Sequence, residues 1–164
     1  MFRKDKRGRE IKKITKVVLS ISFIFYILAL VVLMFLGHRG GIYSDLSLIE
    51  YIKTSSNIVP FKTIGTYVQA MFDGSMNTDI PIKNLGGNLI MFLPMGIYLP
   101  FFIKRISKVG IFIISMIVVL FFLETVQIVS RRGSFDVDDF ILNMMGALLG
   151  YGIWKMKFVQ NLLK

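Results

Sequence analysis

The sequence predicts an all-α membrane protein with four transmembrane helices and short amphipathic helices in the first outer loop. Composition, segment length and charge distribution support this fold class. Of the 164 residues, 54% are hydrophobic and 15 are phenylalanine, which is more apolar surface than one soluble domain of this length buries. Four apolar segments approach the length of a membrane crossing. Basic residues gather before the first segment, between the second and the third, and after the fourth.

The first apolar segment covers residues 17–36 and carries no charge. A helix of this length rises about 1.5 Å per residue and crosses a hydrocarbon core roughly 30 Å thick. It is longer than the apolar part of a signal peptide, and residues 37–40 resemble a small-residue cleavage site poorly. We therefore predict an uncleaved transmembrane helix, with a removed signal peptide as the alternative.

Three further spans are predicted at about 84–103, 109–129 and 139–158. The last is short if it ends at Trp154, and it reaches 158 only if Lys155 and Lys157 extend to the interface. The predicted organisation is then a basic N-terminal segment (1–16), a single membrane domain (17–159) and a short tail (160–164).

The distribution of the +10 net charge predicts the orientation. Residues 1–16 are strongly basic, and the connector 104–108 and the tail after residue 154 carry lysine or arginine without acids. By the positive-inside rule, the protein is a multi-pass plasma-membrane protein with both termini and the tail in the cytoplasm. Nucleic acid is not an expected partner, because no aromatic residues are interleaved with the basic ones.

The long segment 37–83 should not be a structureless loop. Apolar residues recur at helical spacing around residues 46–52 and again at 64–72, after a turn at 57–60. Such short amphipathic helices would lie on the outer membrane interface or cap the bundle.

Polar residues at the outer ends of the spans are the candidate site. Asn88 lies in the second span, and Glu124 and Gln127 share one face of the third. A carboxylate at that depth is costly unless it is paired, hydrated or protonated. Arg132 could supply the counter-charge. A structural Glu–Arg pair and a ligand or cation site both remain open.

Asp136, Asp138 and Asp139 precede the fourth span, and Asn143 lies one turn beyond Asp139. One acid would suffice to cap the helix. Three crowded carboxylates would be relieved by an arginine, a cationic ligand or a divalent cation. No other cofactor is expected, because the chain has no cysteine and only one histidine, His38.

Small residues and proline point to close helix packing. Gly146 and Gly150 form a GxxxG pattern, and Gly96 lies on the same face of the second span as Asn88. Pro94 should kink that span or free a carbonyl that a neighbouring helix satisfies.

Three motifs resemble the VanZ-like family. They are NIVPFKTI at 57–64, which includes Pro60 and Phe61; GNLIMFLPMG at 87–96; and Glu124-x-x-Gln127 followed by RGSFDVDD at 132–139 and Asn143-x-x-Gly146-x-x-x-Gly150. The resemblance implies a small integral membrane protein. It also implies an association with glycopeptide antibiotics, because the founding member is linked to low-level resistance to teicoplanin, a glycopeptide with a lipid tail.

Three functional hypotheses follow. The first is a non-enzymatic cell-envelope protein that binds a lipid-linked cell-wall precursor or a lipoglycopeptide at an outer-leaflet cleft. The second is a membrane enzyme that acts on lipid-linked phosphates with a divalent cation held by the aspartates, and the third is a small transporter. The candidate ligand-binding residues are Asn88, Glu124, Gln127, Arg132, Asp136, Asp138, Asp139 and Asn143, and the candidate structural residues are Pro60, Phe61, Pro94, Gly96, Gly146 and Gly150.

The charge distribution makes a topology prediction. Reporters fused after Lys104 and after Lys164 should be cytoplasmic, and reporters inserted at Asp73 or Gly133 should be external. Compartment-specific reporter enzymes measure this directly. An external C-terminus would reverse the orientation and put the acidic hairpin in the cytoplasm.

Overall fold

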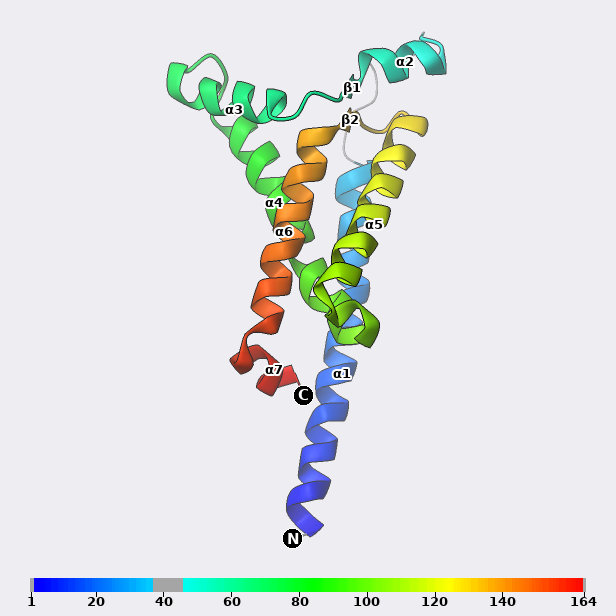
Figure 1. Ribbon diagram of the computed structural model, residues 1–164, viewed down its shortest axis with the longest axis vertical. Coiled ribbons are helices and arrows are strands. Elements are labelled where there is room, and N and C mark those ends of the chain that lie inside the picture. Colours follow the sequence, from blue (N-terminus) through cyan, green and yellow to red (C-terminus); the bar gives the residue numbers. More distant parts are fainter. Residues whose placement is uncertain (1, 37–45, 164) are drawn as a thin grey trace.

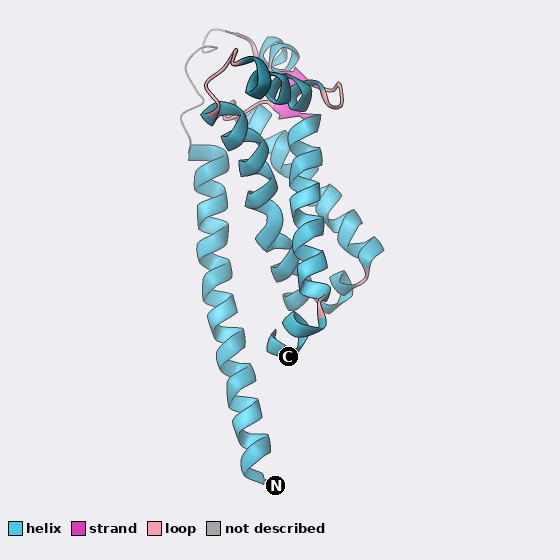
Figure 2. Cartoon of the chain, turned by 90° about the vertical axis from the view of Figure 1, so that its left-hand side faces the viewer, coloured by secondary structure: helices cyan, strands magenta, loops and turns pink. Residues whose placement is uncertain are grey.

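Four long helices form a bundle in the computed structural model, which describes residues 2–36 and 46–163. They are α1 (Phe2–Val31), which continues as the π-helix η1 (Val32–Leu36), α4 (Asp79–Phe102), α5 (Val109–Val129) and α6 (Val137–Lys155). The N-terminal part of α1 projects beyond the other helices at one end (Figures 1 and 2). The all-α fold class is confirmed.

Two short helices lie across the opposite end of the bundle (Figure 1). They are α2 (Leu48–Thr54) and α3 (Lys62–Asp73), separated by the strand β1 (Ser56–Asn57). The strand pairs in parallel with β2 (Phe135–Asp136), at the start of α6. We call this end the capped end. The other end, which contains the 3-10 helix η2 (Lys104–Ser107) and α7 (Lys157–Leu163), is the tail end. Short helices within 37–83 were predicted, and both occur.

Three helices of the described chain are long and apolar enough to cross a membrane: Glu10–Leu36, Asp79–Phe102 and Val109–Val129. They contain the first three predicted spans. The 19-residue α6 is not among them and carries Asp138 and Asp139 in its first turn, so a fourth crossing remains a prediction.

The predicted fourth segment, 139–158, is not one helix. It is interrupted at Met156, whose backbone is extended (φ −62°, ψ 133°), so α6 ends at Lys155 and α7 begins at Lys157. The side-chain amide of Gln160 donates to the Trp154 carbonyl at 2.8 Å. This bond ties α7 to the end of α6, so the chain turns back where the sequence predicted a continuous span.

Helix α6 packs against α4 through glycine. A Cβ atom on Gly146 would overlap the Leu89 carbonyl oxygen, and one on Gly150 would overlap the Leu93 carbonyl oxygen. On α4, a Cβ atom on Gly96 would overlap the backbone of α6 at Ala147. The backbones therefore touch, as the GxxxG pattern predicted.

Aromatic side chains and hydroxyl groups join the remaining helices to this pair. Phe112 of α5 stacks on Tyr151 of α6 with ring centroids 4.5 Å apart. Helix α1 is held by the hydroxyl of Tyr26, which donates to the Met91 carbonyl at 2.9 Å, in the turn that precedes Pro94. Many apolar side chains on the outer faces of α1 and α5 stay exposed, as expected for surfaces that face lipid.

The glycine contacts predict a strong effect of bulk at Gly146. Gly146→Leu should force α4 and α6 apart and lower the free energy of unfolding by about 1–3 kcal/mol. The matched control is Gly152→Leu in the same helix, where a new Cβ would meet nothing within 4 Å. That variant should be neutral or slightly stabilising, because leucine is the better helix former. Thermal unfolding of both variants in detergent measures the difference. Wild-type stability of Gly146→Leu would contradict the α4–α6 contact.

Candidate functional site

A small polar cavity lies within the bundle, toward the capped end. Its volume is about 30 Å³. Residues of η1, α4, α5 and α6 line it, namely Leu33, Met34, Asn88, Met91, Glu124, Gln127, Asp139 and Asn143. Five of the polar residues predicted to share a site therefore meet here, although they come from three different helices. The space is large enough for about one water molecule or one small polar group.

The wall of the cavity includes an irregular helical turn that the sequence did not indicate. The side-chain amide of Gln127 donates to the carbonyl of Met34, in η1, at 3.0 Å. A π-helix shifts the backbone hydrogen-bond register, and such turns are frequent at functional sites. Here the Met34 carbonyl has a side-chain donor on α5, so η1 is joined to the cavity wall.

The other polar residues of the cavity are the amides Asn88 and Asn143 and the carboxylates Glu124 and Asp139. The side-chain amide of Asn88 donates a short hydrogen bond to the Asp139 carboxylate. Glu124 and Asn143 are 2% and 1% exposed. The side-chain oxygen of Asn143 is buried and accepts no hydrogen bond from any residue that the structure describes. Because a buried acceptor is costly to leave unsatisfied, a small molecule in the cavity could donate a hydrogen bond to this oxygen.

Two open grooves adjoin the cavity. One is polar, has a volume of about 390 Å³, and is lined by Thr63, Tyr67, Asn84, Ser134, Asp136 and Asp139. The other is mainly apolar, has a volume of about 350 Å³, and is lined by Leu33, Lys83, Asn84, Gly87, Asn88, Ile90 and Met91. Asp139 borders the cavity and the polar groove, and Asn88 borders the cavity and the apolar groove. The cavity therefore lies between two surfaces of contrasting polarity.

Asp138 does not line the cavity. It binds the start of α3, one of the elements α2, β1 and α3 that cover the capped end and that we call the cap. Its side chain is completely buried. The carboxylate accepts hydrogen bonds from the backbone N–H groups of Phe61, Thr63 and Ile64, at 2.5, 2.7 and 3.1 Å. Phe61 adopts the left-handed conformation (φ 64°) at the start of α3. This conformation forms a concave group of amides that binds anions, and the Asp138 carboxylate occupies it.

Asp136 joins the same segment through side chains. Its carboxylate accepts hydrogen bonds from the Asn57 amide at 3.1 Å and from the Thr63 hydroxyl at 2.6 Å. It also accepts one from the backbone N–H of Asp138 at 2.9 Å and so caps α6. The cap is further held by the Tyr51 hydroxyl, which donates to the Gly133 carbonyl at 2.7 Å.

The structure pairs these acids with groups other than the expected arginine. Arg132 is exposed and forms no ion pair with any described residue. Its backbone N–H donates to the Gln127 carbonyl at the end of α5. The three aspartates do not converge, since Asp136 and Asp138 hold the cap and Asp139 faces Asn88. Among the described residues, no group of three or more acidic, histidine or cysteine side chains could hold a metal ion.

Some residues of the site and cap were not predicted as such. Asn57 was noted as part of a turn and of the first family motif, Thr63 only as part of that motif, and Leu33 and Met34 only as part of an apolar span. The motif residues Pro60 and Phe61 are exposed, but the Phe61 amide is one of the three that bind Asp138. Partners that are backbone amides leave no pattern in a sequence.

The fold and the cavity define a helical membrane protein with a polar site near one end of its bundle. The chain belongs to the VanZ/LLP1 family, which it matches over residues 23–159. It is also similar to Protein VanZ of Enterococcus faecium, with 29% identity over 112 residues, which are 68% of this chain and 60% of that protein. The chain thus covers less than two thirds of that relative. No solved structure matches it.

The hydrogen bonds of Asp138 predict a loss of stability in Asp138→Asn. The asparagine side chain offers one acceptor oxygen to three amides and directs its own N–H groups at them. We expect the free energy of unfolding to fall by roughly 1–3 kcal/mol. Asp73→Asn is the matched control, because Asp73 is an exposed acid at the other end of α3. Unfolding of both proteins in micelles provides the measurement, and equal stabilities would show that Asp138 does not hold the cap.

Proposed function

We propose that the protein is a cell-envelope membrane protein that binds an amphiphilic ligand at the capped end. The observation that carries this proposal is the position of the polar cavity between a polar groove and a mainly apolar groove. A ligand with a polar head and a lipid tail would place its head over Asp136 and Asp139. Its tail would lie along Leu33, Ile90 and Met91.

The charges of the two ends support an outward-facing capped end. Basic side chains gather at the tail end on η2, at the start of α5 and around α7, and the segments 94–123 and 140–164 contain no acid. The acidic residues of the hairpin lie at the capped end. By the positive-inside rule, the tail end is cytoplasmic and the capped end faces the outer leaflet.

The ligand would be a lipid-linked cell-wall precursor or a lipoglycopeptide. Both carry a large polar head on an apolar chain, which suits the paired grooves. By binding either, the protein would lower the access of teicoplanin-type antibiotics to their target. Family membership and the similarity to Protein VanZ support this choice.

Antibiotic susceptibility of a deletion strain tests the proposal. Deletion should increase susceptibility to a glycopeptide with a lipid tail more than to one without a tail. Wild-type protein should reverse the effect. Asn143→Leu should not, although it should insert and fold, because the Asn143 oxygen has no described protein partner to lose. Loss of one hydrogen bond to the ligand weakens binding roughly fivefold.

The matched control is Asn161→Leu, the same replacement at an exposed position of α7. It should restore protection fully, at a membrane level equal to that of Asn143→Leu. An unchanged susceptibility of the deletion strain would reject the envelope role. Full protection by Asn143→Leu would reject the cavity as the binding site.

A further inference from the structure

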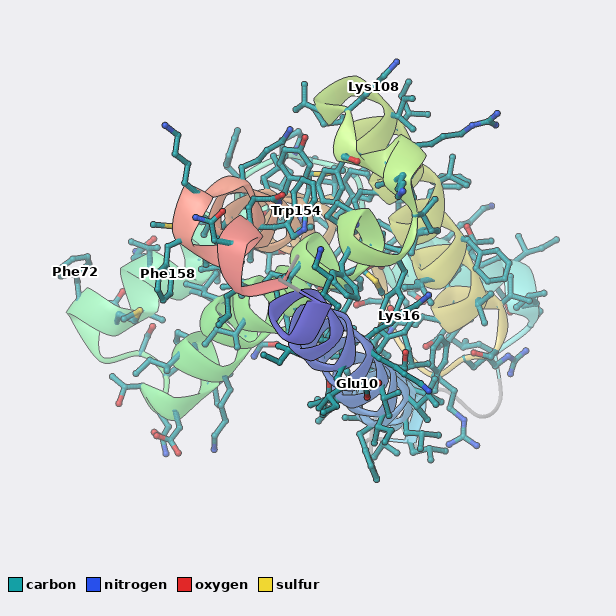
Figure 3. All side chains as sticks on the ribbon, turned by 90° about the horizontal axis from the view of Figure 1, so that it is seen from below. Glu10, Lys16, Phe72, Lys108, Trp154 and Phe158 are labelled. Carbon is teal, nitrogen blue, oxygen red and sulfur yellow. The ribbon has the colours of Figure 1, made fainter. Side chains whose placement is uncertain are left out.

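A groove of about 500 Å³ lies at the tail end, at the opposite end of the bundle from the cavity. Its walls come from the end of α4, from η2, from the end of α6 and from α7. The lining residues are Pro100, Phe101, Lys104, Ser107, Trp154, Gln160 and Leu163. None of them belongs to the cavity or the grooves at the capped end. The view from below looks onto this end of the bundle, and Trp154 is labelled there (Figure 3).

The walls of this groove are held by specific contacts. The hydroxyl of Tyr151 donates to the Ser107 carbonyl at 2.7 Å and fixes η2 against α6. The Gln160 amide donates to the Trp154 carbonyl, which holds α7 beneath the same helix. The extended backbone at Met156 makes this return possible. The groove is therefore built into the fold by two stretches of chain, residues 100–107 and 154–163.

The groove combines an apolar wall with positive charge. Phe101, Trp154 and Leu163 supply apolar surface, and Lys104 is an exposed cation at the edge. A second cation lies nearby, because the Lys155 ammonium nitrogen is 5.4 Å from the centre of a Trp154 ring. The sequence has no acidic residue in 94–123 or 140–164 that could neutralise this charge.

We propose that this groove binds one anionic phospholipid, with its phosphate beside Lys104 and an acyl chain along Phe101, Trp154 and Leu163. Tryptophan is enriched at the membrane interface, where its ring meets both headgroups and chains. Basic pockets between membrane helices bind anionic headgroups. The bilayer offers such a lipid at this depth, and the apolar wall distinguishes it from a soluble phosphate. This site does not depend on the function proposed for the capped end.

Trp154 supplies the signal for a direct test, because it is the single tryptophan of the chain. The full-length protein is placed in nanodiscs of phosphatidylcholine that contain an increasing mole fraction of lipid with brominated acyl chains. Bromine quenches tryptophan fluorescence only at short range. Brominated phosphatidylglycerol should quench Trp154 at an about fivefold lower mole fraction than brominated phosphatidylcholine. Equal quenching by the two lipids would overturn the proposal.

Two lysine variants separate a built site from general attraction to a basic surface. Lys104→Gln should abolish the preference for the anionic lipid. Lys108→Gln removes an exposed lysine of the same connector that does not line the groove, and it should leave the preference unchanged. An equal loss in both variants would show surface attraction only and overturn the site.

Soluble glycerol phosphate tests the role of the acyl chain. It carries the charge of the headgroup without an apolar part, so it should not relieve quenching by the brominated anionic lipid. Relief at millimolar concentration would show that the groove binds a small anion and would overturn the assignment to a phospholipid. Circular dichroism of the lysine variants confirms that both are folded.

Discussion

The contact between the Asp138 carboxylate and the first turn of α3 is the constraint on which the capped end depends. A fully buried carboxylate is tolerated only where hydrogen bonds replace its water, and three backbone amides do so here. The same bonds satisfy amides that the start of a helix leaves without partners. Because successive residues on a helix point about 100° apart, holding Asp138 toward α3 turns Asp139 toward Asn88. The cap and the cavity are therefore set by neighbouring residues of one helical turn.

The glycine contacts set the depth of the cavity. The Leu89 carbonyl lies against Gly146, so Asn88 and Asn143 lie just beyond this contact toward the capped end. Helices this close leave no room for larger side chains at the contact, so the polar amides lie beyond it. The cavity lies beside this tight crossing, and it is polar because α4, α5 and α6 each contribute an amide or a carboxylate.

Local patterns account for what the sequence could predict. The lengths of the apolar segments predicted the first three spans, the glycine spacing predicted the α4–α6 contact, and helical periodicity put Glu124 beside Gln127. The features that the sequence did not predict lack a recognisable local pattern. The Met34 carbonyl of the π-helix is bound by Gln127, and Asp138 is bound by amides at the start of α3 instead of by Arg132, so both depend on how distant segments meet. The break at Met156 is accompanied by a bond between neighbouring turns, from Gln160 to Trp154.

The two ends of the bundle carry different polar groups in different surroundings, and this difference limits which kind of ligand each end can bind. At the capped end, acids and amides are placed inside the bundle, where the low dielectric raises the cost of any unsatisfied group. Hydrogen bonds between elements offset part of that cost, as those of Asp138 and Gln127 do, but no described residue donates to the Asn143 oxygen. At the tail end, cations stay at the surface beside Trp154, where water and headgroups can solvate them. The ligand proposed for the capped end would therefore supply a donor to a buried acceptor, whereas the lipid proposed for the tail end would supply negative charge at an interface.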